Sequence, residues 1–291
     1  QMCIRDSYTS ILIAVVFASM AYSMEVGGNM GKGARNMWGY STMMFTGQWG
    51  LFIVLGLFLF APLFDTPHWF GMMLPVGFTG GFGTAAAVGG ALEGVGADTA
   101  SSLGFTSATV GTLAAITGGV VAGNWGIRKG KVSHVPKELP EELRRGYIKN
   151  IDDRPSLGRA TTNPSSIEPL ALHFGFTILT VMTAYGINQG LSSIWENVSV
   201  PLFAMSMVVG LFFRALMNFV GAEDYLDKDS ISSISGAATD YLIAFGVAAI
   251  VPAAIASYWQ ALLLLFILGT IFCALFLLSL IHISEPTRLG M

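Results

Sequence analysis

The stretch GFTGGFGTAAAVGG, residues 77–90, combines hydroxyl side chains with glycines and carries no charge. Hydroxyl and backbone carbonyl oxygens suit a hard cation such as sodium, and the amide groups at helix N-termini suit an anion. Glycine is a poor helix former, so the stretch is a weak candidate for an ordinary helix. Its amides and carbonyls, with the hydroxyls of Thr79 and Thr84, could therefore hold a substrate or an ion.

Two further polar residues occur in apolar surroundings and are candidates for the same site. The hydroxyl of Ser107 is either a ligand or a group that bonds back to its own helix, and Thr79 has the same alternative. Asp240 opens an apolar run, and an acid within a membrane is a functional hypothesis by default. An Asp at a helix start is also an ordinary N-terminal cap, and this second interpretation is favoured for Asp240.

Two basic residues near apolar runs favour structural roles. Arg214 comes late in the run 199–219, where its long side chain can reach the aqueous face, and a role in substrate binding is the alternative. His173, in LALHFGF, is a candidate proton relay, but a lone histidine on an apolar helix is more often a hydrogen-bonded packing residue.

The composition places the chain in a lipid bilayer. Of its 291 residues, 53% are hydrophobic and 11% are charged, whereas soluble domains carry roughly 25% charged residues. This predicts an all-α polytopic membrane protein that binds no nucleic acid. Seven apolar runs approach the length of a membrane span: 9–24, 43–64, 99–123, 169–190, 199–219, 238–256 and 260–280.

Charge bias predicts that the glycine-rich segment 71–95 is a re-entrant hairpin. The segment 124–167 carries nine of the fifteen Lys and Arg residues and is therefore expected in the cytoplasm. When the spans are counted backwards from this segment, the basic linker 25–42 is also cytoplasmic only if 71–95 enters and leaves the membrane on the same side. Irregular backbone at membrane depth is tolerated where protein buries it or where it lines a cavity. Tight helix packing is the alternative reason for the glycines.

The chain divides into an N-terminal repeat at 9–123 and an incomplete C-terminal repeat at 168–280. SILIAVVFA at 10–18 resembles DYLIAFGVA at 240–248, and charge bias orients the two runs oppositely, as inverted repeats require. A hairpin matching the first would fall beyond the last residue. The ends, 1–8 and 281–291, have the character of translated sequencing adapter, so a fragment truncated at both ends is expected.

GFTGGFGTAAA followed by LGFTSATVGTLAAITGGVVAG resembles the first re-entrant loop and the following helix of the bacterial sodium/glutamate symporter family. VPLFAMSMVVGLFFRALMN is similar to that family's seventh helix, and 238–280 to its eighth and ninth. The resemblance implies an inverted-repeat secondary transporter in the bacterial inner membrane, a homodimer that moves glutamate inward with sodium by alternating access. Sodium is then the coupling ion, and no cofactor is expected. Gly80, Gly81, Gly83 and Thr84 match the family's loop motif, so the resemblance implies that their backbone and the Thr84 hydroxyl line the substrate or sodium site, with sodium at Gly81 and Thr84. Phe82 stands where some relatives have histidine, which bears on the substrate more than on the fold.

Other functions remain alternatives to glutamate symport. A related transporter could carry another carboxylate anion, and re-entrant loops also occur in channels. An intramembrane enzyme would need a Ser/His or paired-Asp arrangement within the spans, and Asp240 has no acidic partner there. The sequence therefore predicts a transporter and not an enzyme.

Overall fold

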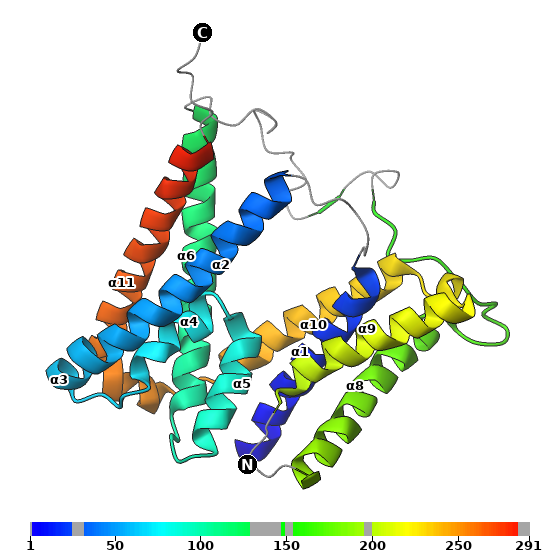
Figure 1. Cartoon of the computed structure of the whole chain (residues 1–291), viewed down its shortest axis with the longest axis horizontal. Helices are drawn as coiled ribbons and strands as arrows, with labels where there is room; N and C mark the ends of the chain where they lie inside the picture. The colour runs from blue at the N-terminus through cyan, green and yellow to red at the C-terminus, as the bar shows by residue number, and fades with distance from the viewer. Residues whose placement is uncertain (1, 25–31, 129–146, 149–153, 195–199, 285–291) are drawn as a thin grey trace. The chain divides into compact units, whose positions relative to one another are not determined.

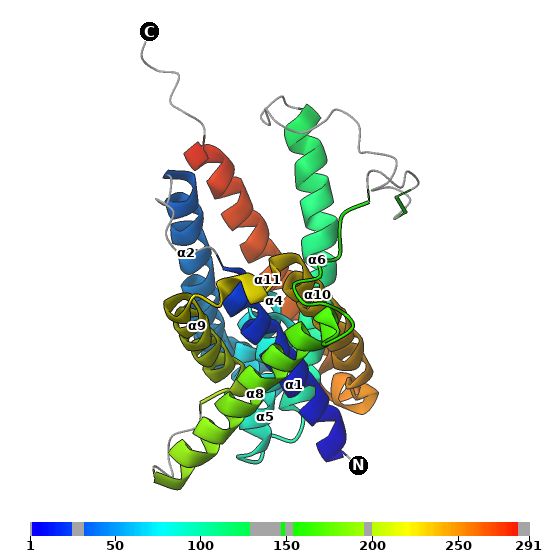
Figure 2. The same ribbon diagram turned by 90° about the vertical axis from the view of Figure 1, so that its right-hand side faces the viewer.

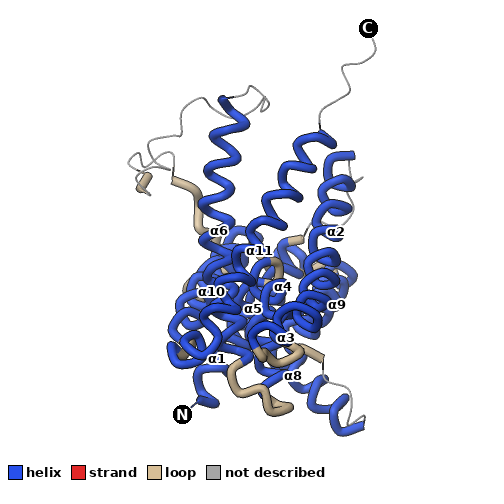
Figure 3. The backbone as a smooth tube through the Cα atoms, turned by 90° about the vertical axis from the view of Figure 1, so that its left-hand side faces the viewer, coloured by secondary structure: helices blue, strands red, loops and turns tan. Residues whose placement is uncertain are grey.

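The computed structural model describes residues 2–24, 32–128, 147–148, 154–194 and 200–284. Within these ranges all regular elements are helices, joined by turns and loops, and no strand is present (Figure 3). Of the terminal segments that the sequence sets apart, 1–8 and 281–291, residues 1 and 285–291 lie outside the described part of the chain.

The helices follow one another with few long loops (Figure 1). They are α1 (Met2–Ser23), α2 (Lys32–Leu55), α3 (Ala61–Phe64), α4 (Met73–Phe78), α5 (Gly81–Glu93), α6 (Ala100–Arg128), α8 (Pro169–Ile194), α9 (Leu202–Val220), α10 (Lys228–Ala248) and α11 (Pro252–Ser284). A π-helical turn, η1 (Gly56–Phe60), joins α2 to α3, and two 3₁₀ turns are η2 (Phe70–Met72) and η3 (Glu223–Tyr225).

The predicted class of an all-helical, multi-pass membrane protein is confirmed. Among the described residues, six helices are long and apolar enough to cross a bilayer. They lie within Ala34–Phe64, Ala100–Gly126, Pro169–Ile194, Leu202–Val220, Lys228–Ala248 and Pro252–Leu277. The predicted first span, 9–24, corresponds to a shorter apolar helix, Tyr8–Ser23. Large apolar side chains remain exposed, such as Phe219 at 90%, as expected where lipid is the solvent.

The predicted bounds of two segments, 238–256 and 25–42, are wrong. The run predicted at 238–256 is a helix over Lys228–Ala248. Its earlier start follows from Asp227, whose carboxylate accepts hydrogen bonds from the Ser230 N–H (2.9 Å) and hydroxyl (2.8 Å) as an N-terminal cap does. Its earlier end precedes Pro252, which lacks an N–H and opens the next helix instead. The linker predicted at 25–42 is likewise helical from Lys32.

The chain forms two compact units, 1–13 with 24–114 and 238–291, and 14–23 with 115–237. The first unit is built on aromatic packing. Phe52, Phe60, Phe70 and Phe105 are almost completely buried there, and Phe60 and Phe70 lie 5.6 Å apart between ring centroids. This unit holds α4, α5 and the first half of α6 (100–114), and therefore the glycine-rich stretch.

The second unit contains α8 and α9, which lie side by side (Figure 1, Figure 2). The last residues of α1 pack on α9, because Gly210 has no side chain and Ala18 and Ala21 approach it closely. The hydroxyls of Tyr22 and Thr180 form a buried hydrogen bond of 2.6 Å between α1 and α8. Small residues and one buried polar pair therefore hold α1, α8 and α9 together.

Candidate functional site

The glycine-rich stretch folds as two short helices separated by a break. The N–H groups of Thr79 and Gly80 both donate to the carbonyl of Pro75, at 3.3 and 3.0 Å, and α4 ends there. Gly81 then has a φ of +69°, a left-handed conformation that costs an L-residue roughly 1–2 kcal/mol and glycine nothing. Gly81 therefore lets the backbone change direction at the point where α5 begins.

Contacts with α6 show that α4 and α5 run in opposite directions. On α4, Leu74 and Phe78 lie against Ser107 and Gly111, so residue numbers rise together in the two helices. On α5, Ala85 lies against Gly104 and Gly89 against Ser101, so the numbers run oppositely. The two helices therefore form a hairpin along α6, with its bend at residues 79–81. Figure 1 shows α4 and α5 beside α6.

The glycines at the bend meet different surroundings. A side chain at Gly80 would collide with Thr84 and with the carbonyl of Val76, and one at Gly83 would collide with Ile13 of α1. A side chain at Gly81 would meet nothing within 4 Å. Of these three positions, Gly81 is the one with open space beside the backbone.

The hydroxyls of the hairpin donate to their own helices. Thr79 donates to the Pro75 carbonyl and Thr84 to the Gly80 carbonyl, each at 2.9 Å. A hydroxyl that donates its proton in this way still presents oxygen lone pairs, which are what a cation requires. The Ser107 hydroxyl is fully buried and donates to the Leu74 carbonyl at 3.4 Å, so it connects α6 to α4 rather than bonding back to its own helix.

The chain matches the family described as the sodium/glutamate symporter over residues 10–283. It belongs to that family. Neither the curated proteins nor the solved structures compared with it gave a match. The family is one of transporters and not of enzymes, in agreement with the helices able to cross a membrane.

In this member of the symporter family, the interpretation of Asp240 as an N-terminal cap is wrong. The helix begins at Lys228, and Asp227 caps it, so Asp240 lies inside α10 with an exposed side chain. The helix meets the hairpin at Gly246, where the ring of Phe82 fills the space a side chain would need. Asp240 lies six residues earlier in α10, which places it roughly 9 Å along the helix axis from that contact.

Residues around the hairpin that sequence reasoning missed are mainly apolar. The rings of Phe82 and Phe105 stack with centroids 6.4 Å apart, and Phe78 stacks on Phe266 of α11 at 6.1 Å. The Ser102 hydroxyl accepts the N–H of Val251 at 2.8 Å, between α10 and α11. The sequence does not predict these contacts, because the partners are more than 20 residues apart and aromatic residues or a serine are common within apolar runs.

His173 takes the packing role that the sequence favours for it. It is fully buried, its Nδ1 bonds to the carbonyl of Pro169, and its Nε2 accepts the N–H of Asp227 at 2.7 Å. His173 therefore joins the start of α8 to the start of α10 in the second unit.

Proposed function

We propose that this protein carries glutamate into the cell together with sodium, by alternating access, as a homodimer in a bacterial inner membrane. The match to the symporter family over 10–283 is the observation that carries the proposal. The hairpin supports it, because transporters place ion and substrate sites at interrupted helices near the middle of the membrane. Thr79, Gly80, Gly81, Gly83, Thr84, Ser107 and Asp240 are the residues that we assign to substrate or sodium.

We assign sodium to the bend at Gly81 and Thr84. The open side of Gly81 leaves room beside the backbone, and Thr84 lies one turn further along α5 with its oxygen lone pairs available. An anionic group of the substrate is assigned to the amide groups that open α5, where no side chain supplies a cap. The bend thus offers oxygen ligands and amide donors within a single turn.

The role of Asp240 follows from its place in a candidate span. A carboxylate exposed on a membrane helix costs free energy unless water, an ion or a polar partner reaches it. Because Asp240 does not cap α10, we assign it to the sodium pathway. Asp240→Asn is then expected to weaken the dependence of transport on sodium.

The proposal is tested by uptake of radiolabelled glutamate into proteoliposomes that contain the purified protein. We expect saturable uptake that requires an inward sodium gradient and is absent when choline replaces sodium. Uptake of glutamate without sodium would overturn the coupling. Uptake of another carboxylate, with no competition by glutamate, would overturn the substrate.

The assignment of Thr84 needs its own variants. Thr84→Ser retains the hydroxyl and is expected to keep the sodium concentration for half-maximal uptake, whereas Thr84→Ala is expected to raise it. Thr112→Ala is the matched control, because Thr112 makes the same bond to its own helix, to Ala108 at 2.8 Å, outside the hairpin. Equal effects of Thr84→Ala and Thr112→Ala would remove Thr84 from the sodium site.

A further inference from the structure

Phe82 is the first large side chain after the bend of the hairpin. It follows Gly81 directly, in the first turn of α5, and is 6% exposed. Its neighbours Gly81 and Gly83 have no side chain, so Phe82 makes the side-chain contacts of this part of the turn. The contacts of its ring therefore bear on where the turn lies.

The ring of Phe82 occupies the space beside Gly246 of α10. A Cβ atom at residue 246 would lie 3.3 Å from Cγ of the ring, 3.1 Å from Cε1 and closer still to Cδ1. All three distances are inside the 3.4 Å at which ordinary contact begins. Because Cγ is among these atoms, the ring cannot clear the space by moving only its far end. A side chain at residue 246 would therefore displace the first turn of α5.

The other contacts of this turn reach α6 and α1. The ring of Phe82 stacks on that of Phe105, with centroids 6.4 Å apart and an angle of 23° between the planes. Phe105 is 1% exposed, so it belongs to the packed interior of the first unit. At Gly83 the chain lies against Ile13, which fills the space that a side chain would need. Two consecutive residues thus attach the turn to α10, α6 and α1.

The opposite property is found at the residue before them, where ligands are assigned. A side chain at Gly81 would meet nothing within 4 Å. The amide groups that open α5 have no side-chain cap, and the Thr84 hydroxyl donates to the Gly80 carbonyl in the same turn. A hydrogen bond from an amide requires a donor–acceptor distance of about 2.9 Å, so a shift of about 1 Å breaks it. The packed residues therefore decide whether the open residue and its neighbours keep the spacing that a ligand needs.

We propose that Phe82 is a positioning residue for the binding site at the bend. By filling the space beside Gly246, its ring fixes the first turn of α5, and with it the amide groups and the Thr84 hydroxyl that are assigned to substrate and sodium. Phe82 acts through the backbone of its own turn and needs no contact with either ligand. The inference rests on the proposed function, because the site that Phe82 positions is the one assigned there.

The experiment is Gly246→Ala, measured by uptake of radiolabelled glutamate into proteoliposomes over a range of glutamate and sodium concentrations. Alanine is a good helix former, so the change leaves α10 intact and acts through the added methyl group. We expect the glutamate concentration for half-maximal uptake to rise about tenfold, the effect of losing one hydrogen bond to a charged group, and the sodium concentration to rise with it. A purely structural role would instead lower the amount of active protein, and therefore the maximal rate, at unchanged half-saturation.

Gly269→Ala is the matched control within the same unit. A side chain at residue 269 would meet Leu74, where α11 packs on α4 outside the first turn of α5. We expect this variant to lower thermal stability and to leave both half-saturation concentrations unchanged. Equal rises in Gly246→Ala and Gly269→Ala would overturn the proposal, as would a fall in the maximal rate alone in Gly246→Ala.

Phe82→Leu tests whether the ring itself transmits the effect of residue 246. Leucine keeps an apolar side chain but lacks the ring, so it leaves room for a methyl group at residue 246. When Gly246→Ala and Phe82→Leu are combined, we expect a rise in half-saturation smaller than the product of the two single rises. Single effects that simply multiply would show that alanine at residue 246 acts on something other than Phe82, and would overturn the proposal.

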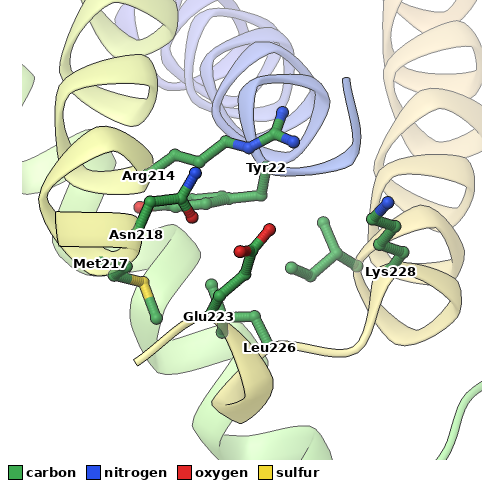
Figure 4. A pocket seen from close by; sticks show the side chains of 8 residues that line it. Tyr22, Arg214, Met217, Asn218, Glu223, Leu226 and Lys228 are labelled. Atoms are coloured by element: carbon green, nitrogen blue, oxygen red, sulfur yellow. The ribbon is translucent and has the colours of Figure 1, made fainter. Parts of the chain in front are cut away.

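Asn218→Ala is a second control, placed in the second unit. Asn218 lines a pocket into which the Glu223 side chain points (Figure 4), and no lining residue of that pocket belongs to the hairpin. We expect unchanged half-saturation concentrations in this variant. A rise equal to that in Gly246→Ala would place glutamate in that pocket and not at the bend, and would overturn the proposal.

Hydrogen exchange separates the positioning role from the transport function. Peptides that cover residues 81–93 report local opening of α5 in the purified protein, with no transport involved. We expect faster exchange at the start of α5 in Gly246→Ala, and wild-type exchange there in Gly269→Ala. Absence of sodium-dependent glutamate uptake by the wild-type protein would refute the proposed function. Wild-type exchange at the start of α5 in Gly246→Ala would refute the positioning role.

Discussion

Gly81→Ala is expected to favour local opening of the hairpin, because alanine is strained in the left-handed backbone conformation of residue 81. The φ of +69° costs alanine roughly 1–2 kcal/mol, and the added methyl group meets nothing within 4 Å, so no steric clash contributes. A cost of 1–2 kcal/mol shifts a local opening equilibrium by about 5- to 30-fold. The N–H of Gly80, which donates to Pro75 at 3.0 Å, should exchange with solvent deuterium faster by that factor.

The assay is hydrogen exchange of the peptides that cover residues 76–84, measured by mass spectrometry in detergent. Gly81→Asn should recover part of the loss, because asparagine tolerates the left-handed conformation. Gly90→Ala is the control: Gly90 also has open space beside it but lies inside α5, so alanine there should stabilise the helix by about 0.5–1 kcal/mol. Unchanged exchange in Gly81→Ala, or equal effects of alanine and asparagine, would refute the left-handed bend.

Three further variants test polar contacts that join helices, each by its thermal unfolding temperature in detergent. Ser102→Ala leaves the Val251 N–H without its acceptor and should cost about 1–3 kcal/mol, and no loss would mean that water replaces the bond. His173→Leu removes the acceptor of the Asp227 N–H and should destabilise the protein similarly, while a neutral effect would show that the buried bond does not hold α8 to α10. Burial acts to raise the pKa of Asp227, but hydrogen bonds from Arg159 and Ser230 outweigh it, so the pKa lies below its ordinary value. The stability that Asp227 contributes is therefore complete above about pH 4 and is lost as the pH falls further. Asp227→Asn should flatten this acid limb, and an unchanged limb would contradict the cap.

The sequence predicted α9 well and α10 poorly, for physical reasons. The apolar run at 199–219 is bounded by Pro201 and Gly221, which begin and end a helix, and the structure has α9 at Leu202–Val220. The first ten residues of α10, KDSISSISGA, are mostly polar or small and give no apolar signal. Their helix depends on the Asp227 cap and on contacts with the linker, such as Gly158 against Ser230.

The candidate site was predictable as a segment but not as a set of contacts. Glycine content alone marked 71–95 as irregular, and the structure places a helix break within it at Thr79–Gly80. Its partners could not be read from the sequence, because Ile13, Phe105 and Gly246 come from three other helices and are ordinary packing residues. The re-entrant position of the hairpin in the membrane stays a prediction, as do the inverted repeat and the roles of the site residues.

The glycines of GFTGGFG are required for different physical reasons. Glycine content alone therefore does not identify which of them serve function. Gly80 and Gly83 are small because Thr84 and Ile13 occupy the space beside them, which is a demand of packing. Gly81 is a glycine because of its backbone angle, and it also leaves open space next to the chain. Loss of transport in a Gly83 variant would therefore report on the fit of α5 against α1. Loss in Gly81→Ala that Gly81→Asn does not repair would report on a ligand at the bend.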